Sequence, residues 1–237
     1  MRPPSLRSRS LEELLSEVTW LQQLPSQARE AVIADAYETS HVKGETVVRM
    51  GDASSSWIGV AEGLLKVAAV DRGGRVIMLT GVPRGSWIGE GAVVKRELRR
   101  YDIVAMRESR LIHVPSSTFR WLLDTSVEFN HVVISHLNER LSQFIAVMEI
   151  DRLDDPVSRV AKILATIFNP VLYPRMSTGL PMSQSELGEL VGLTRQSISN
   201  ALKRLEREGL VTTEYGAIEL NDIAGLRDYH QSSERAD

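Results

Sequence analysis

The chain of 237 residues contains no cysteine, and this absence excludes several kinds of site. Disulfide bonds, cysteine-ligated iron–sulfur clusters and thiolate zinc sites all need thiols. The absence also fits a cytoplasmic protein, which is the location we expect. No apolar run approaches the roughly 18 residues of a membrane-spanning helix. No apolar core follows the N-terminal arginines, as it would in a secretory signal, so we expect no membrane partner.

Signatures of catalysis are also lacking. The chain has neither a P-loop nor the Gly-x-Ser-x-Gly pattern of a nucleophile elbow. The histidines that could serve as haem ligands by residue type alone are His41, His113, His131 and His136. They are not clustered as metal ligands would be, and the last two are five residues apart, which does not place them on one helical face. We therefore expect no catalytic residue, no metal site and no enzymatic activity.

Positive charge is not in excess over the whole chain but is in excess in one segment. The net charge is −3 and the pI is about 6.0, which is not the strongly basic balance of a protein that binds nucleic acid without sequence preference. Between residues 195 and 207, however, four cations stand against Glu206 alone. Any contact with DNA is therefore expected at this segment.

The segment from residue 182 to 220 has the pattern of two short helices followed by a hairpin. Ser183 and Glu186 form a capping-box signature at the start of the first helix. Gly192 supplies the left-handed residue that commonly ends a helix, and Thr194 is suited to cap the second helix. The following residues predict two strands that turn at Tyr215-Gly216. This order predicts a helix-turn-helix with a wing.

The second of these helices, which Gly209 is expected to end, has two different faces. Its apolar residues recur at spacings of four and three and predict a buried face: Ile198, Leu202 and Leu205. The opposite face is polar and carries Arg195, Gln196, Ser199, Asn200 and Lys203. Arginine can bind guanine, and asparagine or glutamine can pair with adenine. The polar face therefore predicts contact with base edges in a DNA groove.

The N-terminal half predicts an antiparallel jelly roll. After short helices between residues 10 and 37, which Pro25 interrupts, β-type runs alternate with glycines. These runs are 45–49, 57–61, 64–70, 76–80, 103–106 and 110–114, with a hairpin turn at 71–74. The residues expected in the core are Val47, Ile58, Leu64, Val67, Ile77, Leu79, Val104 and Ile112.

Helices are expected to follow the jelly roll. Pro115 opens a short helix through Leu123, and a longer helix is predicted over residues 126–153. Its apolar stripe consists of Ile134, Leu137, Leu141, Phe144, Val147, Met148 and Ile150. At 1.5 Å per residue this helix is about 40 Å long, more than a small β domain covers. We interpret the stripe as a dimer seam, with packing against the chain's own jelly roll as the alternative.

A hinge is predicted where the long helix ends. Asp155 is suited to cap the next helix, which Pro156 opens. The predicted fold is therefore of the α+β class. Its parts are an N-terminal β jelly-roll sensor domain (1–125), a long dimerisation helix (126–153) and a C-terminal winged helix-turn-helix domain (154–237).

This order of elements resembles the CRP/FNR family of bacterial transcription regulators from about residue 20 to 225. The motifs that match are Gly85-Ser-Trp-Ile-Gly89-Glu90 with Arg100 ten residues later, and Leu193-Thr-Arg-Gln-Ser-Ile-Ser-Asn200. The resemblance implies a homodimer that binds a palindromic site in double-stranded promoter DNA and contacts RNA polymerase. The DNA-binding residues that it implies are Ser183, Thr194, Arg195, Gln196, Ser199, Asn200 and Lys203, with phosphate contacts from Lys203 and the wing near Tyr215. Relatives often carry Glu or Arg at the places of Gln196 and Asn200, so we expect a different target sequence.

The first motif resembles the family's phosphate-binding cassette. By that resemblance Glu90 would hold the ribose hydroxyl of a cyclic nucleotide, and Arg100 would hold its phosphate. A guanidinium can donate two parallel hydrogen bonds to phosphate oxygens, and backbone N–H groups from Gly89 to Gly91 could add to an anion site. The resemblance thus makes a cyclic nucleotide the first effector to consider.

Three departures from the family pattern argue against cyclic AMP. Tyr101 stands where relatives place a small Ser or Thr, and Asp102 adds a negative charge near the phosphate position. On the long helix, Phe144 and Ile145 replace the polar pair that reads the purine. Glu90 could instead pair with a neighbouring arginine, at position 96, 99 or 100. We expect an effector other than cyclic AMP, with cyclic-nucleotide gating as the alternative.

Two further classes of function stay open. The helical hairpin could bind protein rather than DNA, which would make the chain a regulatory interaction module. The jelly roll could carry a small-molecule enzyme, although its predicted strands offer only His113 as a metal ligand.

Overall fold

The computed structural model describes residues 9–70, 76–150, 152–167, 169–174, 179–180, 182–214 and 216–229. The predicted turn at 71–74 and the wing residue Tyr215 lie outside these ranges. The chain forms two compact units, one of residues 1–65 and 82–135 and the other of residues 66–81 and 136–237. The division falls inside the long helix, and the boundaries at 125 and 153 stay predictions.

Short helices precede the sheets, as predicted. They are α1 (Leu11–Ser16), a 3-10 helix (Leu21–Gln23) and α2 (Ser26–Asp35), and Pro25 stands directly before α2. The next element is a strand that we did not predict, β1 (Tyr37–His41). Its sequence is polar, and it pairs antiparallel with β8, which places Tyr37 opposite His113.

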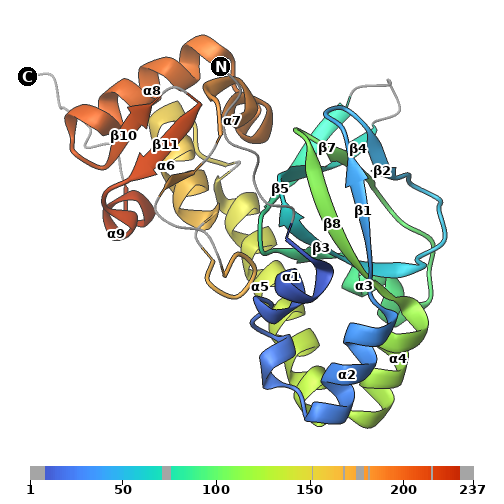
Figure 1. Ribbon diagram of the computed structural model, residues 1–237. Helices are drawn as coiled ribbons and strands as arrows, with labels where there is room; N and C mark the ends of the chain where they lie inside the picture. Colours follow the sequence, from blue (N-terminus) through green and yellow to red (C-terminus); the bar gives the residue numbers. More distant parts are fainter. Residues whose placement is uncertain are drawn as a thin grey trace, which may run out of the picture. The chain divides into compact units, whose positions relative to one another are not determined.

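Two four-stranded sheets follow (Figure 1), in the orders β1-β8-β3-β6 and β2-β7-β4-β5. Their strands are β2 (Thr46–Val48), β3 (Ser56–Glu62), β4 (Leu64–Val70), β5 (Val76–Pro83), β6 (Trp87–Ile88), β7 (Asp102–Ala105) and β8 (Ser109–Pro115). Each of the six predicted strands is present. A short helix, α3 (Glu90–Lys95), follows β6 and was not predicted.

Aromatic side chains form the centre of the N-terminal core. Trp20, Trp57 and Trp87 lie in mutual contact, with ring centroids 4.6 to 5.2 Å apart. Phe119 and Phe129 join them, 5.0 Å from each other. This core draws side chains from the N-terminal helices, from the first sheet and from both helices after it.

The predicted core residues are only partly correct. Four of them are buried, namely Ile58, Leu64, Val67 and Ile112. Val47 and Val104 are half-buried, while Leu79 is 38% exposed. On β7 the buried positions are instead Ile103 and Ala105, because alternate residues of a strand face opposite sides. The side chain of Ile77 lies outside the described set.

The helices after the sheets are close to prediction. They are α4 (Ser116–Thr125), α5 (Val127–Ile150) and α6 (Pro156–Ile167). Ser126 precedes α5, and its hydroxyl accepts a hydrogen bond from the N–H of Phe129 at 3.2 Å. The long helix ends at Ile150, three residues earlier than predicted.

The C-terminal part is the predicted winged helix-turn-helix with two additions. Its elements are β9 (Gly179–Leu180), α7 (Gln184–Val191), α8 (Arg195–Arg207), β10 (Val211–Glu214), β11 (Ala217–Leu220) and α9 (Ile223–Arg227). Strand β9 extends the wing to the order β10-β11-β9, and neither β9 nor α9 was predicted. Helix α6 packs against α8 and α9. Across the described ranges, no helix has the length and apolar character needed to span a bilayer.

Candidate DNA-binding interface and sensor cassette

The turn between α7 and α8 is set by local hydrogen bonds. The Ser183 hydroxyl accepts from the N–H of Glu186 at 3.2 Å, and the Glu186 carboxylate accepts from the N–H of Ser183 at 2.7 Å. This is the predicted capping box. Gly192 has φ 71°, a left-handed conformation that glycine adopts without strain. Thr194 caps α8 by accepting from the N–H of Ser197 at 3.2 Å.

A glycine that we did not single out fixes how closely the two helices approach. A Cβ atom at Gly188 would lie 2.9 Å from the carbonyl oxygen of Leu193 and 3.6 Å from Ile198. A larger residue would push α7 away from the start of α8. The only signal in the sequence is a small residue in the middle of a predicted helix.

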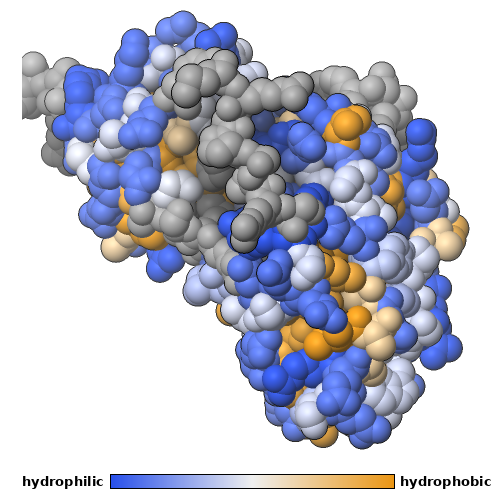
Figure 2. Space-filling view, in the orientation of Figure 1, coloured by the Kyte–Doolittle hydropathy of each residue, from blue (hydrophilic) through white to orange (hydrophobic). Residues whose placement is uncertain are grey.

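Helix α8 presents its polar face to solvent and buries its apolar face. Ile198, Leu202 and Leu205 are at most 1% exposed, as predicted. The exposed side chains on the other face are Arg195, Gln196, Asn200 and Lys203, while Ser199 is half-buried. Figure 2 shows mainly hydrophilic residues over α8. The apolar face therefore anchors the helix in its domain and leaves the polar face available to a ligand.

The cations of α8 differ in availability. Arg204 donates to Glu208 at 3.1 Å, and this hydrogen bond raises the pKa of Arg204. Arg195 and Lys203 have no ion-pair partner among the residues that the structure describes. These two side chains can therefore bind phosphate or a base edge without first breaking a salt bridge of the protein.

The wing adds residues that our sequence reasoning missed. A trough of about 310 Å³ lies between the starts of α7 and α8 and the two wing strands. Ser183 and Arg195 line it together with Gln184, Thr213 and Glu214. The backbone N–H of Thr213 is held by Glu206 at 2.9 Å, which fixes the wing to α8. The sequence signal for this trough was the hairpin pattern alone.

Asp155 caps α6 as predicted. One Asp155 oxygen accepts from the N–H of Ser158 at 2.7 Å and the other from the N–H of Val157 at 3.3 Å. Helix α6 is in turn tied to the end of α7, because Arg159 donates to the carbonyl oxygen of Val191 at 3.0 Å. The cap therefore sits at the start of the helix against which α7 and α8 pack.

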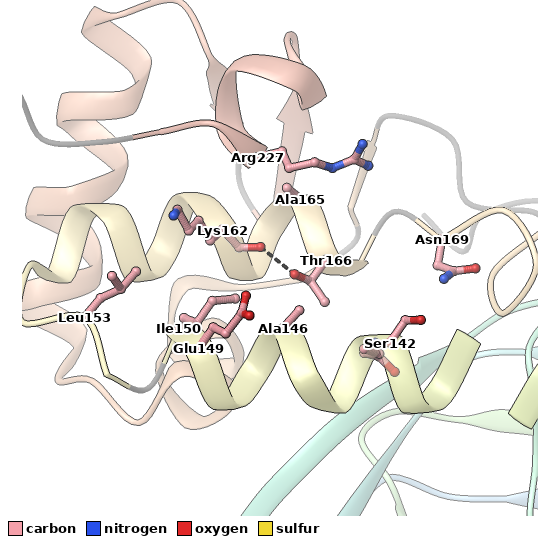
Figure 3. A pocket seen from close by; sticks show the side chains of 11 residues that line it. Ser142, Ala146, Glu149, Ile150, Leu153, Lys162, Ala165, Thr166, Asn169 and Arg227 are labelled. Atoms are coloured by element: carbon pink, nitrogen blue, oxygen red, sulfur yellow. Dashed lines mark hydrogen bonds between the residues drawn. The ribbon is translucent and has the colours of Figure 1, made fainter. Parts of the chain in front are cut away.

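The joint between α5 and α6 is loosely packed. A cavity of about 330 Å³ separates the two helices, and Ala146 and Ile150 of α5 face Ala165 and Thr166 of α6 across it (Figure 3). A close-packed interface would resist a change in the angle between these helices. The cavity leaves room beside the Asp155 cap, and the hinge role of Asp155 stays a prediction.

Asp155→Ala is expected to destabilise the protein by about 1 kcal/mol, because α6 loses its N-terminal acceptor. If Asp155 also sets the geometry of the hinge, DNA affinity will change by more than this loss of stability explains. Chemical denaturation and DNA titration measure the two effects. Asp155→Asn retains an N-cap acceptor and is the matched control. Unchanged DNA affinity and unchanged ligand response in Asp155→Ala would remove the hinge role.

In the cassette, Glu90 is enclosed by the protein. It is the first residue of α3, is 1% exposed, and accepts a hydrogen bond from the indole N–H of Trp57 at 3.3 Å. Gly89 precedes it with φ 96°, and a Cβ atom there would collide with the guanidinium of Arg99. The carboxylate predicted to hold a ribose is thus a buried group of the aromatic core.

The buried cation of the cassette is Arg99, which we had not chosen. It is 3% exposed and donates to the carbonyl oxygens of Gly89, at 3.1 Å, and Ser56. Burial lowers the pKa of Arg99, and the charges of Tyr101 and Glu90 oppose this effect. Arg99 links the start of α3 to the start of β3 and thereby holds the cassette in shape.

Arg100 lies on the surface. Its side chain is 72% exposed and donates to Glu97 at 2.7 and 3.0 Å. Asp102 accepts from the N–H of Met50 at 2.7 Å, so this carboxylate has a structural partner. Tyr101 is half-buried, and Phe144 on α5 is 62% exposed. The ligand roles of these residues stay predictions.

A series of four hydrogen bonds links β1, β8 and Ser56 of β3, whose carbonyl oxygen binds Arg99. Glu45 contacts Nδ1 of His41 at 2.9 Å, and Thr39 lies 2.9 Å from Nε2 of His41 and 2.8 Å from Nε2 of His113. Nδ1 of His113 lies 3.0 Å from the hydroxyl of Ser56. If both imidazole rings are neutral and Glu45 is ionised, one assignment of the hydrogens satisfies every contact. In that assignment Ser56 donates to His113, His113 to Thr39, Thr39 to His41 and His41 to Glu45. We predicted none of this series, because β1 was not predicted.

Among the groups in this series of hydrogen bonds, His113 has the most strongly shifted pKa. Burial, followed by the charges of His41 and Arg99, lowers its pKa from 6.5 to about 4. Tyr37 stacks on the ring, with centroids 4.7 Å apart and planes 6° from parallel. The histidine is therefore neutral at pH 7, and both of its ring nitrogens have hydrogen-bond partners, Thr39 and Ser56.

The two halves of the chain each match a known family of domains. Residues 38–126 match the cyclic nucleotide-binding domain, and residues 158–229 match the Crp-like helix-turn-helix domain. The chain belongs to the CRP/FNR family of transcription regulators. Its helix-turn-helix is accordingly a DNA-binding element, and its N-terminal half is a sensor-type domain.

Individual relatives agree with this assignment. Transcriptional regulator SdrP of Thermus thermophilus is 29% identical over 177 residues, which cover 73% of this chain and 83% of SdrP. The cAMP-activated global transcriptional regulator CRP of Pasteurella multocida is 22% identical over 70% of this chain and 81% of its own. The structure of FixK2 from Bradyrhizobium japonicum has a TM-score of 0.66 at 20% identity, and covers 81% of this chain and 95% of FixK2. At 20% identity, this similarity shows that the two proteins share a fold.

Proposed function

We propose that this regulator is a homodimer of the cytoplasm that binds a palindromic promoter site and responds to a small molecule other than cyclic AMP. The observation that carries the proposal is the exposed polar face of α8, which stands on a fully buried apolar face. A recognition helix needs both properties, because it must be held rigidly and must leave its polar side chains free for base edges. We propose no enzymatic role.

The exposed apolar stripe on α5 supports the homodimer. Its members, with exposed fractions between 39% and 62%, are Ile134, Leu137, Leu141, Phe144, Ile145 and Met148. Two predicted seam residues do not belong to it. Ile150 is 4% exposed and Val147 half-buried, and both pack in the core of the C-terminal unit. An apolar stripe this long on a solvent-exposed helix is typical of an interface.

In the proposed complex, two α8 helices would enter successive major grooves about 34 Å apart. Arg195, near the start of α8, would read a base, while Lys203 would contact phosphate and position the protein. Contact with RNA polymerase is part of the proposal and follows from the family. The exposed start of α8 supports base reading, because the first residues of a recognition helix reach deepest into the groove.

Arg195→Ala is expected to weaken binding to the cognate site by about 1–3 kcal/mol and to relax preference at one base pair. The measurement is a titration of the purified protein against the cognate duplex and its single-base variants. Lys203→Ala is the control, because loss of a phosphate contact weakens binding to every sequence alike. An equal loss on all sequences for Arg195→Ala would reduce this residue to a phosphate contact.

The geometry of the cassette supports an effector other than cyclic AMP. Glu90 is occupied by Trp57 inside the core, and Arg100 is turned toward Glu97 at the surface. A cyclic nucleotide would have to separate both pairs before it could bind as family members bind it. Phe144 also lacks a donor or acceptor for a purine. The match to the cyclic nucleotide-binding domain keeps nucleotide gating as the second candidate.

Excess cyclic AMP or cyclic GMP is expected to leave the thermal unfolding midpoint unchanged. A ligand at a hundred times its dissociation constant would add about 2.7 kcal/mol, which for a chain of this size would raise the midpoint by roughly 5–10 °C. A rise of that size that disappears in Arg100→Ala would establish nucleotide gating. It would overturn the proposed effector class and leave the DNA-binding role intact.

A further inference from the structure

Two amide side chains on the exposed face of α8 are joined to each other. Gln196 and Asn200 are four residues apart, so they lie on neighbouring turns of one helical face. The Gln196 amide nitrogen donates to the Asn200 carbonyl oxygen at 3.1 Å. Both side chains are otherwise exposed to solvent. The pair is therefore organised before any partner arrives.

The nearest cations beyond this pair on the same face are Lys203 and Arg204, three and four residues after Asn200. Arg204 is bound to Glu208 at 3.1 Å, and in the described part of the chain no hydrogen bond joins Lys203 to either amide. On the other side Thr194 and Ser197 satisfy one another, with their hydroxyl oxygens 2.9 Å apart. The two amides are thus left to pair with each other.

Outside the shared bond, the joined pair keeps one whole donor group and one whole acceptor group for a third molecule. With Gln196 donating one of its two amide hydrogens, these are the NH2 group of Asn200 and the carbonyl oxygen of Gln196. If both amides were turned over, Asn200 would donate, and the outward groups would be an amide hydrogen of Gln196 and the oxygen of Asn200. The outward pattern is one donor and one acceptor in either case.

Among the four bases, adenine matches that pattern most fully in the major groove. Its edge offers the N7 acceptor next to the N6 donor, whereas guanine offers two acceptors. Cytosine offers a donor alone, and thymine offers an acceptor beside a methyl group. A guanine or thymine would leave the outward carbonyl oxygen without a donor, and unpaired buried polar groups weaken binding.

We infer that Gln196 and Asn200 act as a single reader of one adenine in each half-site. This inference rests on the proposed function, since it assumes that α8 lies in a major groove. It goes further by joining two residues into one specificity element and naming the base that they select. Because the two side chains are already hydrogen-bonded, less side-chain freedom is lost on binding.

The test is a double-mutant cycle on duplexes that carry the site recovered by selection from random DNA. The full-length protein and Gln196→Ala, Asn200→Ala and the double variant are titrated against the site with adenine replaced by each other base in both half-sites. We expect each single variant to lose roughly 5- to 150-fold in discrimination per half-site. The double variant should lose little more than either single variant, because one element is removed in each case.

Gln196→Glu gives a sharper test of the shared reader, because it keeps the shape of the side chain and removes its amide hydrogens. A carboxylate accepts from the exocyclic amine of cytosine, so preference at this position should move from adenine toward cytosine. All four variants are changed only on the exposed face of α8, and thermal unfolding checks that the fold is retained.

The outcomes separate this inference from the proposal beneath it. Failure to enrich any sequence would overturn the proposed sequence-specific function. An enriched site at which the two single variants affect different base pairs, or at which their losses multiply in the double variant, would overturn the joint reader alone. Selection of a base other than adenine at the shared position would do the same.

Discussion

The double substitution Leu141→Glu and Phe144→Glu is expected to convert the proposed dimer into monomers and to lower DNA affinity by more than 100-fold. These two side chains are 59% and 62% exposed in the single chain and stand at the middle of the α5 stripe. Burying one such side chain stabilises by about 1.5–3 kcal/mol, and a two-fold axis doubles every contact. Because about 60% of each side chain remains to be covered, the four lost contacts amount to roughly 4–7 kcal/mol, before any repulsion between the new carboxylates is counted.

Loss of the dimer removes one of the two half-site contacts, so affinity for a palindrome should fall toward that of one α8 helix. Sedimentation and a DNA titration measure both effects. Ser142→Glu is the matched control, since this exposed residue lies beside the stripe on the same helix and is not one of its members. A double variant that remains dimeric would show that the subunits associate elsewhere.

Acid is expected to destabilise the protein through His113. Its pKa is about 4 in the folded protein and 6.5 ordinarily. As the pH falls below 6.5, His113 therefore becomes protonated in the unfolded state but stays neutral in the folded state. The free energy of unfolding declines until the pH reaches the folded-state pKa. The contribution is fully present above pH 6.5 and is lost between pH 6.5 and 4. Its total is roughly 3 kcal/mol, at about 1.4 kcal/mol for each unit of pKa.

Urea unfolding at pH 7.5 and 4.5 measures this loss, and His113→Gln provides the comparison because its amide does not titrate. Carboxylates that also lose stability in acid, such as Glu45 with its lowered pKa, remain in both proteins and cancel. The wild type should lose about 2.5 kcal/mol more than the variant between the two pH values. Equal losses would mean that folding does not lower the pKa of His113.

Local signals explain which elements the sequence predicts well. The caps at Ser183, Thr194 and Asp155 depend on hydrogen bonds within three residues of the chain, and all three are confirmed. The two faces of α8 follow from helical periodicity and are confirmed as well. Features of this kind need no knowledge of the rest of the molecule.

Features that depend on distant partners were missed or misplaced. Strand β1 has a polar sequence and is defined by its pairing with the distant strand β8. The side chains of Glu38 and Arg110, which are 72 residues apart, form an ion pair between the two strands. Arg99 and Arg100 are adjacent and chemically identical, so the sequence cannot tell which one enters the core. That choice depends on the carbonyl groups of Ser56 and Gly89, which the fold brings to Arg99.

The same distinction holds for the candidate sites. The residues of α8 could be named from the sequence because they share one helix. The Gln196–Asn200 hydrogen bond, the trough beside the wing and the hydrogen-bond chain at His113 required the structure. The effector, which depends on contacts between several strands and α5, was the least predictable part.

Selection of binding sites from a random DNA library by the purified full-length protein tests the central claim most directly. Sequence-specific recognition by paired α8 helices predicts an enriched inverted repeat whose half-sites are about 10 base pairs apart, centre to centre. Affinity for that site should exceed affinity for unrelated DNA by at least about 10³-fold. A library that stays unenriched, with equal binding to every sequence, would contradict the account.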